Sequence, residues 1–155
     1  MERPAPLIKI IATFFGLGYL PLMPGTAASI AGLLIFLLVG NRSAWYVLIT
    51  AFMLFAGFAV SGRAERAFDR KDSRRIVIDE VAGMLTALLF LPYNIRIALS
   101  GLVLFRIFDI AKPYPCNRLQ HLSGSAGIML DDIVAGLYAN IILQAVLRLI
   151  SLKVS

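Results

Sequence analysis

Apolar segments recur along almost the whole chain of 155 residues, and this pattern restricts the possible folds more than any other feature. Hydrophobic residues make up 59% of the sequence and charged residues only 15%, so the mean hydropathy of +0.83 exceeds that of ordinary soluble proteins. The apolar runs are Leu7–Leu22, Ala27–Val39, Ala44–Val60, Ile76–Leu91, Ile95–Phe108 and Ile128–Ile150. Because apolar character continues past the first run, the pattern indicates a membrane-embedded protein and not a signal peptide followed by a soluble domain.

We expect these runs to form an all-α bundle of about six helices in a single domain, residues 1–155. The helices are predicted over Leu7–Gly18, Thr26–Val39 with Thr26 as N-cap, Ala44–Phe68, Ile76–Leu91, Ile95–Ile110 and a last segment from Ile128. A helix over Ile76–Leu91 would be about 24 Å long, whereas the hydrocarbon core of a bilayer is about 30 Å thick. Several helices are therefore expected to be short transmembrane or partially spanning segments.

Five of the nine acids lie inside or at the edge of apolar runs, in three short stretches that we call the acidic segments. They are Asp79 and Glu80, Asp109, and Asp131 and Asp132. Ionised carboxylates are costly to remove from water unless a cation, a metal or hydrogen-bond donors compensate them. A cluster of carboxylates without histidine or cysteine ligands suits hard cations such as Mg²⁺ or Mn²⁺.

The distribution of basic residues predicts where these acids lie. Six of the fifteen cations fall within Arg63–Arg75, and a juxtamembrane basic segment is typical of the cytoplasmic side. This segment either contacts anionic lipid or only sets orientation, and the net charge of +6 does not indicate nucleic-acid binding. If the helices alternate in direction, all three acidic segments lie at the same depth in the membrane, on the cytoplasmic side.

Two of the acidic segments resemble each other in sequence. In Ile78–Gly83 and Leu130–Gly136 a Val-Ala-Gly triplet follows the acids, and Asp79 and Asp132 each precede a glycine by four positions. At helical spacing the aspartate and the glycine share a face, and glycine lets a neighbouring helix come close. This short similarity is compatible with two similar half-sites, and no duplication is inferred from six residues.

Cationic and small residues near the acids point to phosphate chemistry. Arg106 and Lys112 flank Asp109 by three positions on either side, as structural ion pairs or as a clamp for a phosphate. Gly25 and Thr26 open a predicted helix whose backbone N–H groups suit an anion. Together these features favour metal-assisted phosphoryl transfer on a lipid headgroup, with one carboxylate as general base or as nucleophile.

Two further residues carry no predicted chemistry. Cys116 is a single cysteine, so no internal disulfide is possible, and it is interpreted as an incidental loop thiol. His121 is expected on the surface.

Several motifs, in one order and spacing from Phe15 to Tyr138, resemble the phosphatidylglycerophosphatase A family. They are Pro24-Gly25-Thr26 with Ser29, Asp72 followed by Ile76–Glu80 and Gly83, Phe105–Asp109, Lys112–Pro115, and Gly127–Gly136. Arg75 stands where the resemblance favours a small polar residue, and Ser125 and Ala126 interrupt the glycine-rich approach to Gly127. These departures affect loops more than the acids.

The resemblance implies an all-α, Mg²⁺-dependent phosphatase of the bacterial inner membrane, multi-pass, with its active site toward the cytoplasm. Its substrate would be an anionic phospholipid, phosphatidylglycerophosphate, which it would convert to phosphatidylglycerol. Catalytic positions would be Asp79, Glu80, Asp109, Asp131 and Asp132, with metal ligands Asp79, Glu80, Asp131 and Asp132, and phosphate contacts from Arg106, Lys112, Thr26 and Gly25. The oligomeric state, the number of metal ions and the role of Asp72 stay open.

Other functions are compatible with acids in apolar surroundings. An ion or proton carrier would use intramembrane carboxylates, but it would spread them over several depths. A CDP-alcohol phosphotransferase would need a longer, fixed run of aspartates and glycines, which is absent. A purely structural role would pair the acids internally with arginines.

Overall fold

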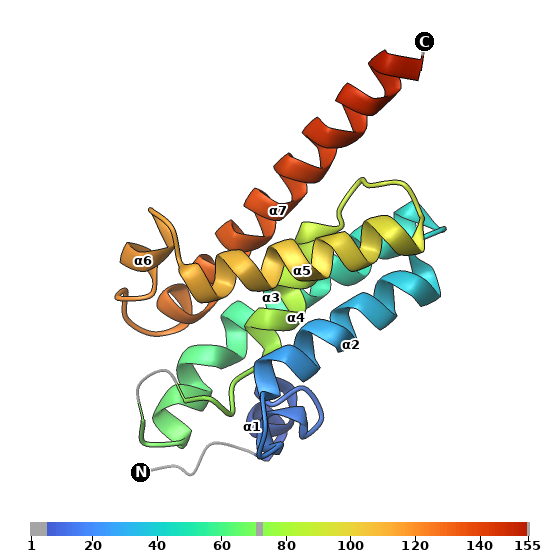
Figure 1. Ribbon diagram of the computed structural model, residues 1–155. Coiled ribbons are helices and arrows are strands. Elements are labelled where there is room, and N and C mark those ends of the chain that lie inside the picture. Colours follow the sequence, from blue (N-terminus) through green and yellow to red (C-terminus); the bar gives the residue numbers. More distant parts are fainter. Residues whose placement is uncertain (1–5, 71–72, 155) are drawn as a thin grey trace.

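The computed structural model describes residues 6–70 and 73–154, and all regular structure within these ranges is helical. In this part of the chain seven α-helices and a short 3-10 helix form a bundle with α4 at its centre (Figure 1). The elements are α1 Pro6–Ala12, η1 Leu17–Tyr19, α2 Pro24–Val39, α3 Ser43–Ala67, α4 Ile78–Ala87, α5 Ile95–Ala111, α6 Cys116–Leu119 and α7 Ser125–Val154. The predicted all-α bundle is confirmed, with one more α-helix than the six expected.

The first two helices differ from their predicted bounds. The helix expected over Leu7–Gly18 ends at Ala12, because Phe14 and Phe15 have left-handed backbone angles (φ 44° and 55°) that a right-handed helix cannot contain. The prediction of Thr26 as N-cap is wrong, since α2 begins at Pro24. Proline suits the first helical position because the N–H that it lacks would have no partner there.

The central helix α4 is shorter than the predicted Ile76–Leu91 and is buried on almost all sides. It contacts α2, α3, α5 and α7, and apart from the partly exposed Glu80 all of its residues are buried. Ten residues give a helix of about 15 Å, half the thickness of a hydrocarbon core. We therefore describe α4 as a core helix of the bundle and not as a membrane span.

Side chains from α3 and α7 satisfy the buried end of α4. The hydroxyl of Tyr46 donates to the carbonyl of Leu85 at 2.7 Å. The amide of Asn140 donates to the carbonyls of Ala87 at 3.0 Å and Leu89 at 2.8 Å. Since the last carbonyls of a helix have no partner within it, these bonds remove a large cost of ending α4 inside the bundle.

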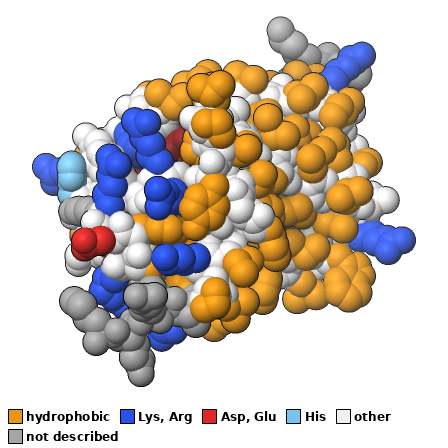
Figure 2. Space-filling view, turned by 90° about the horizontal axis from the view of Figure 1, so that it is seen from below, with side chains coloured by type: hydrophobic (Ala, Val, Ile, Leu, Met, Phe, Trp, Pro, Cys, Tyr) orange, Lys and Arg blue, Asp and Glu red, His pale blue; other side chains and the backbone are white. Residues whose placement is uncertain are grey.

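Two helices, α3 and α7, are long and apolar enough to cross a membrane. Only 22% and 28% of their most apolar stretches are buried inside the protein, so these stretches are not enclosed as the core helices of a soluble protein are. Hydrophobic side chains cover most of the face in Figure 2, whereas lysine and arginine side chains gather mainly at one end. The C-terminal part of α7 extends beyond the other helices (Figure 1). These features indicate a membrane protein.

The additional helix α6 lies in the segment predicted as a loop between α5 and α7. It is a single turn, and Cys116 at its start is a buried core residue, which corrects its interpretation as a loop thiol. The last helix begins at Ser125, three residues before the predicted start. The hydroxyl of Ser125 accepts a hydrogen bond from the backbone N–H of Gly62 at 2.8 Å, which ties the start of α7 to α3.

Candidate active site

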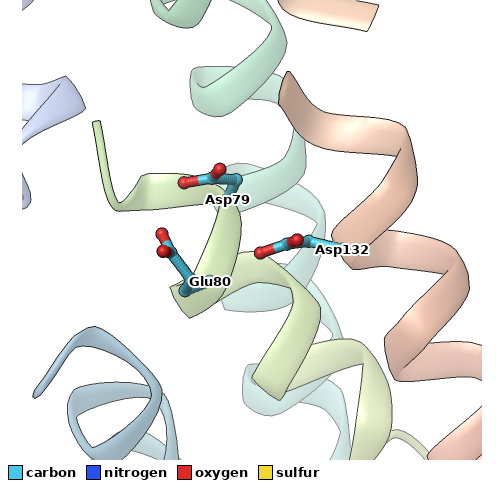
Figure 3. A group of neighbouring side chains, drawn as sticks. All are labelled: Asp79, Glu80 and Asp132. Atoms are coloured by element: carbon cyan, nitrogen blue, oxygen red, sulfur yellow. The ribbon is translucent and has the colours of Figure 1, made fainter. Parts of the chain in front are cut away.

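Three carboxylates from two helices gather at the N-terminal end of α4. Asp79 and Glu80 occupy the first turn of α4, and Asp132 points toward them from α7 (Figure 3). One oxygen from each residue lies within 4.8 Å of the others, so a single metal ion could contact all three. Asp79 and Asp132 are buried, and Glu80 is partly exposed. We call these three residues the acid group.

Two glycines let α4 and α7 approach closely enough to bring the acid group together. A Cβ added at Gly136 would overlap the carbonyl oxygen of Gly83, and one added at Gly83 would lie 2.8 Å from the carbonyl oxygen of Asp132. Asp79 and Asp132 each lie four positions before one of these glycines, so acid and glycine share a helix face. The predicted close approach at these glycines is therefore present, and it places the acids beside each other.

Each residue of the acid group has a buried carboxylate oxygen without a hydrogen-bond partner among the described residues. These oxygens are Asp79 Oδ1, Glu80 Oε2 and Asp132 Oδ2. Burial raises the pKa of Asp79 well above its usual range, and the charges of Glu80 and Asp132 raise it further. Burial also raises the pKa of Glu80. Because unpaired buried charge is costly, this donor set could hold a metal ion.

Lys112 connects the other two acids to the acid group. Its ammonium group donates to Asp131 Oδ2 and lies 3.6 Å from Asp109 Oδ1 and 4.0 Å from Asp132 Oδ1. Partial burial lowers the pKa of Lys112, but the hydrogen bond to Asp131 and the carboxylate charges raise it more, so the lysine stays charged. Arg106 Nη1 donates to Asp109 Oδ2 at 2.5 Å. Asp131 thus lies outside the acid group, and its predicted part in metal binding stays a prediction.

A pocket of about 540 Å³ opens beside Glu80 of the acid group, and we call it the polar pocket after the three arginines and the carboxylate in its lining. Its lining includes Gly25, Thr26, Arg74, Arg75, Glu80 and Arg106. A Cβ at Gly25 would lie 2.5 Å from Glu80 Oε1, so the absence of a side chain allows the start of α2 to approach this carboxylate. The first backbone N–H groups of α2 have no partner within the helix, and Arg106 Nε is buried without a hydrogen-bond partner. The pocket therefore offers donors and positive charge suited to an anion.

Arg74 and Arg75 line the polar pocket but are not among the residues predicted to bind phosphate. The Arg75 guanidinium lies over the rings of Tyr19 and Phe68, 5.7 Å and 5.5 Å from their centroids, which holds it beside the pocket. Arg75 stands where the family resemblance favours a small polar residue, and this departure could have marked it as a site residue. It also belongs to the basic segment Arg63–Arg75, for which only lipid contact or membrane orientation was predicted.

Neither Cys116 nor His121 belongs to the acid group. His121 is exposed, as expected. Asp72 lies outside the described residues.

Comparison with known proteins identifies the family. The model of the family described as Phosphatidylglycerophosphatase A matches residues 10–147, which include the acid group, Lys112 and the polar pocket. The chain belongs to the phosphatidylglycerophosphatase A family. The family resemblance stated from the motifs is confirmed, and the chain is a phosphoric monoester hydrolase.

Three known bacterial relatives match most of the chain. A Bacteroides thetaiotaomicron protein named "Putative phosphatidylinositol-3-phosphatase" is 35% identical, over 92% of this chain and 95% of its own length. Proteins named phosphatidylglycerophosphatase A from Haemophilus influenzae and Escherichia coli are 31% and 34% identical. These matches cover 90% and 82% of this chain, and 88% and 76% of the relatives. No solved structure matches the chain significantly.

Proposed function

We propose that this family member hydrolyses phosphatidylglycerophosphate to phosphatidylglycerol and inorganic phosphate, with Mg²⁺ as cofactor and Mn²⁺ as a substitute. The observation that carries the proposal is the polar pocket, which brings positive charge and helix-end donors against Glu80, one of the three carboxylates of the acid group. The names of the H. influenzae and E. coli relatives support this substrate.

Asp79, Glu80 and Asp132 are the proposed metal ligands, with Asp131 as a further ligand if Lys112 releases it. Their all-oxygen donor set and unsatisfied buried oxygens fit a hard divalent cation. Such an ion, when bound, supplies positive charge for the phosphoryl oxygens and lowers the pKa of a bound water.

The phosphate of the substrate is proposed to bind in the polar pocket. Arg106 and the N–H groups of Gly25 and Thr26 border this pocket and can donate to phosphoryl oxygens. Asp109 holds one Arg106 nitrogen at 2.5 Å and leaves the buried Nε free, so we assign Asp109 the orientation of Arg106. Lys112 supplies a further positive charge for the phosphate from the side of Asp131.

Hydrolysis requires a water oxygen to bond to phosphorus while the bond from phosphorus to the glycerol oxygen breaks. A proton must leave the attacking water, and a proton must reach the departing alkoxide. Glu80 is the acid that lines the polar pocket, and we assign it the water proton, which it then delivers to the departing glycerol oxygen. In the other route open from the sequence, a carboxylate attacks phosphorus first and water hydrolyses the acyl phosphate.

The proposed location is the bacterial inner membrane, with several helices crossing and the active site toward the cytoplasm. Arg63 and Arg66 lie near the C-terminal end of α3, and Arg74 and Arg75 precede α4, so these basic residues lie at the end of the bundle that holds the acid group. Figure 2 shows most of the lysine and arginine side chains of this view at one end of the apolar face and a few at the other. Positive loops favour the cytoplasmic side.

The decisive experiment measures phosphate release from phosphatidylglycerophosphate by protein purified in detergent. Activity is expected with Mg²⁺, weaker or equal with Mn²⁺, and none with EDTA. Asp79→Asn should lose activity by at least about 100-fold while the protein still folds, because a metal ligand is removed. Asp69→Asn, an exposed aspartate outside the acid group, is the matched control. Full activity of Asp79→Asn would refute the site.

The same assay tests the alternatives. The B. thetaiotaomicron relative is named for a different phosphomonoester lipid, so phosphatidylinositol 3-phosphate should be compared as substrate at equal concentration. Faster release from it would change the substrate and keep the chemistry. A carrier would need carboxylates spaced across the bilayer, whereas these acids cluster at one end of α4.

A further inference from the structure

A second hollow of about 570 Å³ lies beside the polar pocket, along α5. Thr26 and Arg106 line both hollows. The rest of the second lining is apolar and includes Leu102, Val103, Ile107 and Ile110. We call this hollow the α5 groove.

The two hollows meet at a side chain that can face both. Arginine has an apolar stem and a charged head, so Arg106 can cover hydrocarbon with the one and contact an anion with the other. Its guanidinium already bonds to Asp109, and its Nε is unpartnered. Polar and apolar surfaces therefore change over at Arg106, as a molecule with a phosphate head and a hydrocarbon tail requires.

The apolar surface continues from the groove along α5, away from the acid group. Leu99, Val103 and Ile107 are four residues apart, so they lie on one helix face, and they are 48%, 58% and 52% exposed. From Ile107 to Leu99 this face extends about 12 Å toward the start of α5. The direction leads from the charged end of the bundle into its apolar part.

We propose that the α5 groove binds an acyl chain of the lipid substrate while the phosphate of the same molecule occupies the polar pocket. This inference rests on the proposed function, because it needs a lipid phosphomonoester as substrate. The groove then positions the phosphate against the acid group, and Thr26 and Arg106 mark the depth at which head and tail separate.

The first test fills the groove. Val103→Trp places a large side chain in it, and Val146→Trp makes the same change at an exposed position of α7 outside it. Each variant is assayed on long-chain and on dihexanoyl phosphatidylglycerophosphate. For Val103→Trp we expect the ratio of kcat/KM, long chain to short chain, to fall about tenfold, which corresponds to burying about two fewer methylene groups. For Val146→Trp the ratio should not change.

Every result of this assay bears on one of the two proposals. An unchanged ratio in Val103→Trp, including an equal fall of kcat/KM for both substrates, would overturn the proposal that the α5 groove binds an acyl chain. A wild-type protein that releases no phosphate from either lipid would overturn the proposed function instead.

A second measurement tests the groove without turnover. The wild-type protein in EDTA is photolysed with a phosphatidylglycerophosphate that carries a diazirine in one acyl chain, and the labelled peptides are mapped. Label on α5 around Val103 should be displaced by unlabelled phosphatidylglycerophosphate and not by phosphatidylcholine. Equal displacement by both lipids would show bulk membrane lipid in the groove and would overturn the proposal, as would label confined to other helices.

Discussion

Two segments of similar sequence, Ile78–Gly83 in α4 and Leu130–Gly136 in α7, form opposite halves of the site. Asp79 and Asp132 correspond, because each lies four positions before its glycine, and both join the acid group. The extra acid differs: Glu80 follows Asp79, whereas Asp131 precedes Asp132. Since neighbouring residues on a helix point about 100° apart, the two extra acids leave the shared face in opposite directions.

This difference separates two kinds of carboxylate. Glu80 reaches the acid group and the polar pocket, whereas Asp131 accepts a hydrogen bond from Lys112. The two segments therefore share an aspartate and a glycine on one helix face. The aspartates supply two of the proposed metal ligands, and the glycines form the contact between the helices. The second acid of each segment differs: Glu80 lines the polar pocket, whereas Asp131 pairs with Lys112.

The largest expected effect separates the two acids of α7. Asp132→Asn should reduce kcat by about 1000-fold and abolish Mg²⁺ dependence, because it removes a proposed ligand. Asp131→Asn should reduce kcat by about 10-fold to 100-fold and keep that dependence. Phosphate release measured over a Mg²⁺ titration checks both. Equal losses and equal metal dependence would remove the distinction between them.

A smaller effect tests whether Asp131 acts through Lys112. Lys112→Gln should reduce kcat/KM about tenfold, and Lys112→Arg should recover part of it by keeping the charge. If the two residues act as a pair, the double variant Lys112→Gln with Asp131→Asn will have the same kcat/KM as the less active of the two single variants. Additive losses in this double-mutant cycle would assign Asp131 an independent role, such as metal binding.

A single added methyl group should disrupt the contact between α4 and α7 at these glycines. Gly136→Ala should lower the free energy of unfolding by about 1–3 kcal/mol, because its Cβ would overlap the carbonyl oxygen of Gly83 and force α4 and α7 apart. Thermal unfolding in detergent measures the loss, and activity should fall with it. Ala145→Val, at an exposed position of α7, is the control and should change neither.

The smallest expected effect is on pH dependence without metal. A carboxyl pKa that is raised in the folded state makes stability fall as the pH rises from about 4 to that raised value, because the folded state holds the proton longer. The melting temperature of the wild-type protein in EDTA should follow this direction. Asp79→Asn should reduce the slope, and so should Mg²⁺. An equal slope in all three samples would contradict the raised pKa of Asp79.

Most of the fold could be predicted from apolar runs. The long helices α3 and α5 begin and end within one residue of the predicted bounds, because polar turns and prolines bound their apolar runs. The start of α2 and the end of α1 could not be predicted, because Phe14, Phe15 and Met23 adopt left-handed backbone angles that these residue types do not favour. The end of α4 depends on bonds from Tyr46 and Asn140, which are 39 or more residues away in the chain.

The sequence by itself determined the family, the helical class and the five acids, because charge inside apolar segments and motifs in fixed order are local properties of the chain. Only the tertiary structure decided that Asp79, Glu80 and Asp132 form one group while Asp131 pairs with Lys112. It also placed Arg74 and Arg75 at the polar pocket and set the α5 groove beside it. The reason is that a helix fixes the direction of each side chain, but the neighbour in that direction comes from another part of the chain.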